Sequence, residues 1–346
     1  MSVAILVASL WSFGSIDRMI DITFFRSERH DAQIVFGTPE PLGAVLAARK
    51  LPGVLVAEPF RQVAARIGNR AWSKTVGILG RPSQPVLSRV LDPELRPMRM
   101  PEAGLILSEA LADALHVRRG DLVTVEVLEG RRPVVILPVS GISVGYVGLG
   151  AAMEIGTLNR LMLEGAMVSG VSLQIDPAQE AAFFAAARTA PKTDLISVTS
   201  LMLDRFRETL AENITVMITV YVVLAGIIAI GVVYNFSRIA LSEQGRELAS
   251  LRVLGFSNRE VAGVLFGELA TVVLIAQPLG WLIGYGIALA MVAAFSSDLY
   301  RVPFVIGREV FAVASLVVCA AALVSAWAIR ARINNLDMIA VLKTRE

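Results

Sequence analysis

The sequence has very few of the residues that build disulfide frameworks, metal centres and hydrolytic sites. Cys319 is the single cysteine among 346 residues and lies inside an apolar run, which excludes a disulfide framework. The two histidines, His30 and His116, stand far apart beside charged residues, and we expect both to be solvated surface groups. The sequence therefore predicts no metal site, no cofactor and no catalytic residue.

A phosphate-binding loop is also missing. The string Gly-x-x-x-x-Gly-Lys-Ser/Thr, whose backbone cradles nucleotide phosphates, occurs nowhere in the chain. Any ATP hydrolysis linked to this protein must therefore come from another chain. The formal net charge of +2 indicates no nucleic-acid partner, because the basic residues gather where membrane topology places them.

Charged residues are scarce, and long apolar runs take their place. Only 18% of the chain is charged while 55% is hydrophobic, and the mean hydropathy of +0.64 is too high for a soluble globular chain. Three uncharged runs are long enough to span a bilayer, at residues 214–234, 269–297 and 310–329. A fourth apolar run, residues 1–16, resembles an uncleaved span with its beginning removed. We expect four transmembrane helices.

Basic residues orient these spans. Two segments, residues 237–260 and the C-terminal tail, each carry four, whereas residues 296–309 carry only Arg301 and Arg308. The eight are Arg238, Arg246, Arg252, Arg259, Arg330, Arg332, Lys343 and Arg345. Loops rich in Lys and Arg stay in the cytoplasm. Both termini are therefore expected to be cytoplasmic, and the stretch between the first two spans should lie outside.

That outer stretch reads as a folded α+β domain. Short β-rich runs alternate with helical ones between Pro and Gly residues, at 32–36, 54–57, 75–79, 122–128, 134–139 and 171–175. Residues 201–213 are expected to form a stalk helix that continues into the second span. The predicted organisation is helix 1–16, extracytoplasmic domain 17–213, helix 214–236, cytoplasmic coupling helix and turn 237–257, helix 258–297, helix 308–330 and cytoplasmic tail 331–346.

Residues 241–257 form the most informative segment. Leu241, Leu248, Leu251 and Leu254 recur at helical spacing beside a charged surface, which predicts a short amphipathic helix at the inner membrane face. Gly255 suits the left-handed position that ends a helix. A capping box of Ser257 with Glu260 and a hydrophobic contact of Phe256 with Val261 should begin the next helix. Composition alone fits a lipid-surface helix and a docking element equally well.

A family resemblance favours docking. The string Glu243-x-x-Arg246-Glu247-Leu248-Ala249, followed by Leu251-Arg252-Val253-Leu254-Gly255, resembles the signature after the second span of FtsX-like permeases, the family of MacB and LolC. The resemblance implies that this helix sits in a groove of a cytoplasmic ABC ATPase subunit. The docking residues it implies are Glu243, Arg246, Glu247, Leu248, Leu251, Arg252 and Gly255. Gln244 and Gly245 depart from the family pattern.

Weaker similarities extend along the chain. Residues 108–112 and 117–121 resemble the outer-domain helix and Gly-Asp turn of that family. Gly280 and Gly284 resemble the glycine-rich half of its third span, where small residues let helices pack closely. The opening residues 2–31 resemble the middle of long permeases with two four-helix units. This resemblance implies that the chain is the C-terminal half of such a permease.

The resemblance implies a function. A permease of this kind lies in the bacterial inner (plasma) membrane, contacts membrane lipid and pairs with a second permease unit or a second copy. Its partner ATPase drives export or mechanotransmission, with lipoproteins, lipids, peptides or amphiphilic drugs as candidate substrates. The alternatives are an FtsX-like regulator of a cell-wall hydrolase, without transport, and a membrane-anchored ligand sensor. Glu268 is the ionisable residue closest to the interior of a span, and it is a further candidate site.

Overall fold

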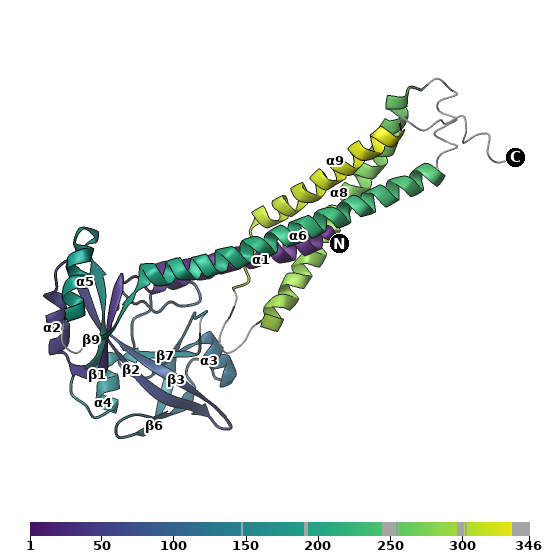
Figure 1. Cartoon of the computed structure of the whole chain (residues 1–346). Coiled ribbons are helices and arrows are strands. Elements are labelled where there is room, and N and C mark those ends of the chain that lie inside the picture. The colour runs from purple at the N-terminus through teal and green to yellow at the C-terminus, as the bar shows by residue number, and fades with distance from the viewer. Residues whose placement is uncertain are drawn as a thin grey trace. The chain divides into compact units, whose positions relative to one another are not determined.

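The computed structural model describes residues 1–146, 148–189, 193–243, 254, 256–295, 301 and 303–333. These residues divide into two compact units (Figure 1). One unit contains residues 1–16, 210–294 and 304–346 and is helical, and we call it the membrane unit. The other contains residues 17–209 and 295–303, and we call it the sheet domain. The sheet domain therefore takes nearly all its residues from between the first and second membrane helices.

The chain alternates strands and short helices in the sheet domain. Its elements are η1 (Asp21–Ser27), β1 (Ala32–Pro41), α2 (Gly43–Arg49), β2 (Val54–Asn69), β3 (Trp72–Arg81), β4 (Leu105–Ser108), α3 (Glu109–Ala114), β5 (Leu122–Val127), β6 (Val134–Ser143), β7 (Gly150–Glu154), α4 (Ile155–Leu161), β8 (Met167–Ile175), η2 (Pro177–Gln179), α5 (Glu180–Thr189) and β9 (Thr193–Val198). The helices of the membrane unit are α1 (Ser2–Ile20), α6 (Thr199–Glu243), which begins in the sheet domain, α8 (Asn258–Phe295) and α9 (Arg308–Ile333).

The nine strands are ordered β3-β7-β4-β6-β5-β2-β8-β1-β9, with an additional pairing of β3 with β2. That extra pairing closes β2, β3, β7, β4, β6 and β5 into a ring, while β8, β1 and β9 continue from β2 as an extension of the sheet. The 16-residue strand β2 belongs to both parts. Its first residues pair with β8, and its last residues pair with β3 and β5. A single strand therefore holds the two parts of the domain together.

Each part of the sheet has its own apolar core. Leu105, Leu107 and Ile78 lie fully buried inside the ring with Leu111 from α3. In the extension, one face packs on α2 and α5, where Phe183 is fully buried among β1 and β8 side chains. Burial of side chains of this size contributes roughly 2 kcal/mol each. The opposite face of the extension is left for polar side chains.

The described residues include four helices long and apolar enough to cross a membrane, within Ser2–Ser27, Val216–Phe236, Phe266–Ala294 and Arg308–Trp327. Val216, Leu282, Leu323 and Trp327 are each more than 60% exposed, which suits side chains that face lipid. The expected fold class is confirmed, because an α+β domain lies between the first and second of four spans. The chain is a multi-pass membrane protein.

All six predicted strands are present, although most are longer than their apolar runs suggested. The sequence reading missed β4, β7 and β9. Strand β7 is rich in Gly and Ala, which have low β propensity, and β4 is only four residues long. Both become strands because neighbours in the ring pair with them on each side. Residues 201–213, the expected stalk, lie within α6, a single helix that also contains the second span.

Candidate functional site

The predicted docking segment lies mostly outside the described residues. Glu243 is the last residue of α6, and its side chain is exposed. The other predicted docking residues lie outside the described part of the chain: Arg246, Glu247, Leu248, Leu251, Arg252 and Gly255. The docking role of this segment therefore stays a prediction.

The turn that follows it is described and contains the predicted capping box. The Ser257 backbone N–H and hydroxyl both donate to the Glu260 carboxylate at 2.8 Å, and the Glu260 N–H donates back to the Ser257 hydroxyl at 3.4 Å. This reciprocal arrangement satisfies donors that the first turn of α8 would otherwise leave without partners. The capping box is confirmed. The Val261 side chain, which was expected to contact Phe256, is outside the described part of the structure.

In the membrane unit, α8 packs closely against α1. A Cβ atom placed on Gly280 would lie 2.6 Å from the Cβ of Val3, and one on Gly284 would lie 2.7 Å from the Cβ of Val7. Real Cβ atoms do not approach that closely, so the two glycines allow the backbones of these helices to come together. Any larger residue would push the helices apart.

Glu268 and Gln277 are polar residues within the third span, which lies in α8. Glu268 is half-buried near the start of the span. Gln277 is 6% exposed, and neither of its amide atoms has a hydrogen-bond partner among the described residues. A buried amide without a partner inside a membrane helix is destabilising by several kcal/mol. Polarity within a span was the signal that could have identified Gln277.

A second candidate site lies in the sheet domain, where the chain arrives from the first membrane helix. Residues 27–31, which we call the linker, pair with residues 87–89. Glu28 and Ser88 form an antiparallel β-bridge, Arg29 N–H donates to the Leu87 carbonyl at 2.6 Å, and Arg89 N–H donates to the Ser27 carbonyl at 2.8 Å. The linker is therefore fastened to the domain by its backbone.

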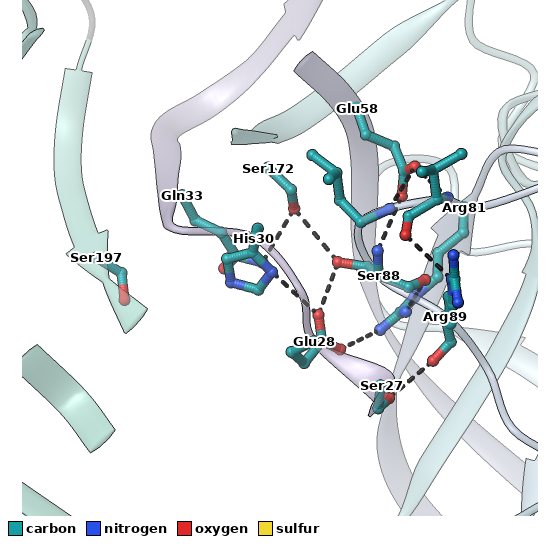
Figure 2. Close-up of polar contacts among 12 residues, drawn as sticks. Ser27, Glu28, His30, Gln33, Glu58, Arg81, Ser88, Arg89, Ser172 and Ser197 are labelled. Atoms are coloured by element: carbon teal, nitrogen blue, oxygen red, sulfur yellow. Dashed lines mark hydrogen bonds and ion pairs between the residues drawn. The ribbon is translucent and has the colours of Figure 1, made fainter. Parts of the chain in front are cut away.

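Side chains reinforce this attachment (Figure 2). The Glu28 carboxylate accepts hydrogen bonds from Arg81 Nη2 and from the Ser88 hydroxyl, each at 2.7 Å. His30 Nδ1 lies 3.3 Å from Glu28 Oε2, the oxygen that also accepts the Ser88 hydroxyl, and Arg81 Nη1 donates to the Ser88 carbonyl. Nearby, the Glu58 carboxylate accepts from the backbone N–H groups of residues 86–88. The Glu28 carboxylate thus joins the linker to Arg81 through an ion pair and to Ser88 through a hydrogen bond, and Glu58 holds residues 86–88 in place.

The environment of Glu28 keeps it ionised. Burial by itself raises its pKa, but the Arg81 guanidinium, the nearby His30 ring and the hydrogen bonds from Ser88 and Arg81 outweigh burial and lower the pKa from 4.5 to about 2. Its side chain is 27% exposed and that of Arg81 8%, so water screens the pair weakly. The attractive interaction is therefore fully present at neutral pH.

The position of His30 corrects the sequence reading, whereas His116 is exposed as expected. His30 is only 9% exposed and lies against Glu28 instead of facing solvent. The charged residues beside His30 in the sequence indicated an exposed side chain. His30 is buried instead, because the linker passes between the sheet and the loop that follows β3. Glu28, Arg81 and Ser88 were not identified at all. Glu28 lies 53 residues from Arg81 and 60 residues from Ser88 in the sequence, and no local pattern connects them.

The polar face of the sheet extension continues from this cluster. Ser197, Gln33, Ser172 and Glu58 are paired in register across β9, β1, β8 and β2, which places one polar side chain on each of four adjacent strands. Gln33 Nε2 donates to the Ser172 hydroxyl at 3.1 Å. A cavity of about 320 Å³ borders this row, and its apolar lining includes Phe24, Phe60, Leu79 and Met202.

The linker also meets the start of α6. Asp31 N–H donates to the Leu173 carbonyl at 2.9 Å, and the Asp31 carbonyl accepts the Thr199 N–H at 2.9 Å. Asp31 Oδ2 accepts the Ile175 N–H at 2.8 Å. Strands β1 and β9 are antiparallel neighbours. Asp31, just before β1, and Thr199, just after β9, are therefore held side by side. Displacement of α6 must therefore move the strand pair or break these bonds.

One family model matches the C-terminal part of the chain. Residues 219–338 match the model of the family described as FtsX-like permease C-terminal, so the expected resemblance is confirmed over that range. No curated protein matches the chain. The match covers the second, third and fourth spans and the segment between the second and third, which contains the predicted docking residues.

Two solved structures are similar to the sheet domain. The periplasmic region of MacB from Actinobacillus actinomycetemcomitans has a TM-score of 0.36 at 12% identity, covering 52% of this chain and 94% of that one. The extracellular domain of the noncanonic ABC-type transporter YknZ from Gram-positive bacteria has a TM-score of 0.33 at 12% identity, covering 49% and 98%. Both scores are below 0.5, and the likeness adds nothing to the functional argument.

Proposed function

We propose that the chain is the permease subunit of an ABC-type export or mechanotransmission complex. A cytoplasmic ATPase hydrolyses ATP, and the resulting movement passes through the spans to the sheet domain, which lies outside the membrane. Both termini are cytoplasmic in this arrangement. The permease has no ATPase site, because no phosphate-cradling loop occurs in its sequence. The family match over residues 219–338 supports this assignment.

The observation that carries the proposal is the continuity of α6. This helix has 45 residues, which at 1.5 Å per residue makes it about 67 Å long. Its first residue is bound to the linker through the Thr199 N–H, and its last residue, Glu243, opens the predicted docking segment. Apart from the first and last turns, an α-helix forms its backbone hydrogen bonds within itself, so it transmits displacement along its length without needing other contacts. Movement at Glu243 would reach the β1–β9 pair.

The partners follow from this arrangement. The ATPase would bind the segment that begins at Glu243, through Arg246, Glu247, Leu248, Leu251, Arg252 and Gly255. A second permease unit, or a second copy of the chain, would complete the membrane assembly, and exposed apolar side chains of the spans would meet lipid. An amphiphilic substrate, such as a lipoprotein, lipid, peptide or drug, is the class that a pathway beside the bilayer would handle.

Charge reversal at Glu247 tests the docking role. If Glu247 contacts the ATPase, Glu247→Lys replaces attraction by repulsion at a close interface, and such changes weaken binding by several kcal/mol. Membrane insertion should survive, because a lysine there agrees with the bias of cytoplasmic loops towards positive charge. Recovery of the ATPase with affinity-tagged permease from solubilised membranes, at equal permease levels, is the measurement. We expect it to fall at least tenfold.

A matched control lies on α6. Glu208→Lys makes the same charge change at an exposed residue near the other end of this helix, and it should leave ATPase recovery unchanged. If residues 241–257 instead form a lipid-surface helix, Glu247→Lys should strengthen attachment to anionic lipid and leave ATPase recovery intact. Undiminished recovery with Glu247→Lys would remove Glu247 from the docking interface.

A further inference from the structure

The hairpin of β2 and β3 ends in an exposed group of aromatic and cationic side chains. Asn69 pairs with Trp72, so Arg70 and Ala71 form a two-residue turn. The Trp72 side chain is 54% exposed, and its ring packs edge-on against the ring of His116, with centroids 4.8 Å apart. We call the residues Arg70, Trp72, His116, Arg118 and Arg119 the tip patch.

The backbone of this turn is unusual for the residue it contains. Arg70 has φ of +54°, in the left-handed region that hairpin turns normally fill with Gly, Asn or Asp. A side-chain-bearing residue such as arginine is disfavoured there. Strain of this kind, where a less strained residue was available, suggests that the side chain itself is needed. The sequence therefore presents an arginine at the tip despite the turn geometry.

The tip patch carries excess positive charge. Arg118 and Arg119 follow the C-terminus of α3 and are exposed, as is Arg70. Among the described residues, no carboxylate forms an ion pair with any of these three guanidinium groups. Two carboxylates close in sequence have other partners: Asp121 Oδ2 accepts the Arg118 backbone N–H at 2.7 Å, and Asp113 pairs with Arg301. The patch can therefore attract an anionic partner.

Arg301, from the segment between the third and fourth spans, contacts the sheet domain close to the tip patch in sequence. Arg301 Nη2 lies 2.7 Å from Asp113 Oδ2, and the Arg301 N–H donates to the Tyr146 carbonyl at 3.0 Å. Asp113 is in α3, three residues before His116. Arg301 is also three residues before Phe304, so the Cα atoms of Arg301 and Phe304 are at most about 11 Å apart.

Phe304 belongs to the membrane unit. Its ring packs against Trp11 of α1 at 5.8 Å and against Tyr285 of α8 at 5.2 Å between centroids. Phe304 is four residues before the first residue of α9, the fourth span. Arg301, which pairs with Asp113, is seven residues before the start of α9, so only a short stretch of chain separates this ion pair from the fourth span.

We propose that the tip patch binds the head-group layer of the bilayer from which residues 295–307 emerge, with Trp72 at the interface and Arg70, Arg118 and Arg119 on anionic phosphates. Trp prefers the head-group layer because its ring is apolar and its N–H is polar. Cations near an anionic bilayer add electrostatic attraction that salt screens. The site gives the sheet domain a second, reversible attachment to the membrane, independent of any ATPase.

A nitroxide at the tip tests this site in the whole protein. Ala71→Cys, in a Cys319→Ala background, places the label between Arg70 and Trp72. The chain is reconstituted in nanodiscs of phosphatidylcholine alone or with phosphatidylglycerol, and accessibility to oxygen and to a water-soluble relaxation agent is measured. We expect the label to be protected from the water-soluble agent in the anionic discs and less so in the neutral ones.

Arg131→Cys supplies the matched control label. Arg131 is an exposed arginine of the same domain that lies beyond the far end of β5, about 20 Å of strand from the tip. Its label should remain water-accessible in both discs. Replacing Arg70, Arg118 and Arg119 together by glutamine should lower the ratio of bound to free tip about a hundredfold, because each cation contributes roughly fivefold.

A salt titration of the unsubstituted tip gives a second readout that does not depend on the folding of the triple variant. Raising the ionic strength from about 0.1 M to about 1 M shortens the screening length from about 10 Å to about 3 Å and should release the tip. Equal accessibility of the labels at 71 and 131 in anionic discs would overturn the proposal. So would equal protection at 71 in a lipid-free polymer belt, because the contact would then be with protein.

Discussion

Removing the charge of Glu28 should loosen the linker from the sheet domain. Lowering the pKa of this carboxyl from 4.5 to about 2 corresponds to roughly 3 kcal/mol of stabilisation of the ionised form. Glu28→Gln removes that attraction and leaves the Arg81 guanidinium buried without a countercharge, which also destabilises. We therefore expect the linker to open about 100-fold more often at neutral pH, since 1.4 kcal/mol is a factor of ten.

Hydrogen exchange of the whole chain in detergent measures this opening directly. The Arg29 and Arg89 amides bond across the junction, so peptides covering residues 27–36 and 85–92 report on its opening. Glu126→Gln is the matched control. It removes a carboxylate that lies 2.9 Å from Arg66, but the two side chains are 40% and 49% exposed, and such pairs contribute less than about 1 kcal/mol.

The pH dependence has a definite sign. The pKa of Glu28 is lower in the folded protein than in an unfolded chain, so its contribution is fully present above pH 4.5. It is lost as the pH falls from 4.5 towards 2, because protonation then removes the charge in the folded state as well. The difference between wild type and Glu28→Gln should shrink over that range. Equal acceleration by Glu28→Gln and Glu126→Gln at pH 7 would refute the reasoning.

Three further predictions address the membrane unit and topology. Purified chain should hydrolyse no ATP in a phosphate-release assay, and activity without a copurifying partner would contradict the permease assignment. In a Cys319→Ala background, a cysteine at Gly130 should react with an impermeant thiol reagent added to intact cells while one at Gly245 should not, and the reverse pattern would invert the proposed topology. Gly284→Leu should destabilise the α1–α8 contact by about 1–3 kcal/mol and lower the yield of monodisperse protein by size exclusion, whereas Gly286→Leu, where a Cβ meets no atom within 4 Å, should behave like wild type.

Particular elements explain which features were predictable. The spans were readable because hydrocarbon imposes one requirement, an uninterrupted apolar run of sufficient length, on consecutive residues. The capping box of Ser257 with Glu260 was readable because both partners lie within one helical turn. Strands β4 and β7 were not, because their short or small-residue sequences become strands only through neighbours that lie far away in sequence.

The cluster around Glu28 and the tip patch could not be predicted either, because their residues also lie far apart in the sequence. Glu28 meets Arg81 and Ser88 only because the linker is folded over the loop after β3, and His30 is buried for that reason alone. Trp72 contacts His116 only because the sheet closes into a ring. Asp113 contacts Arg301, 188 residues away in sequence, only because the segment between the last two spans reaches the sheet domain. Local sequence by itself determined the membrane character, the four spans and the caps, because those depend on neighbouring residues. Tertiary structure decided which charges are paired and which surfaces are free, because those depend on residues that only the folded chain brings together.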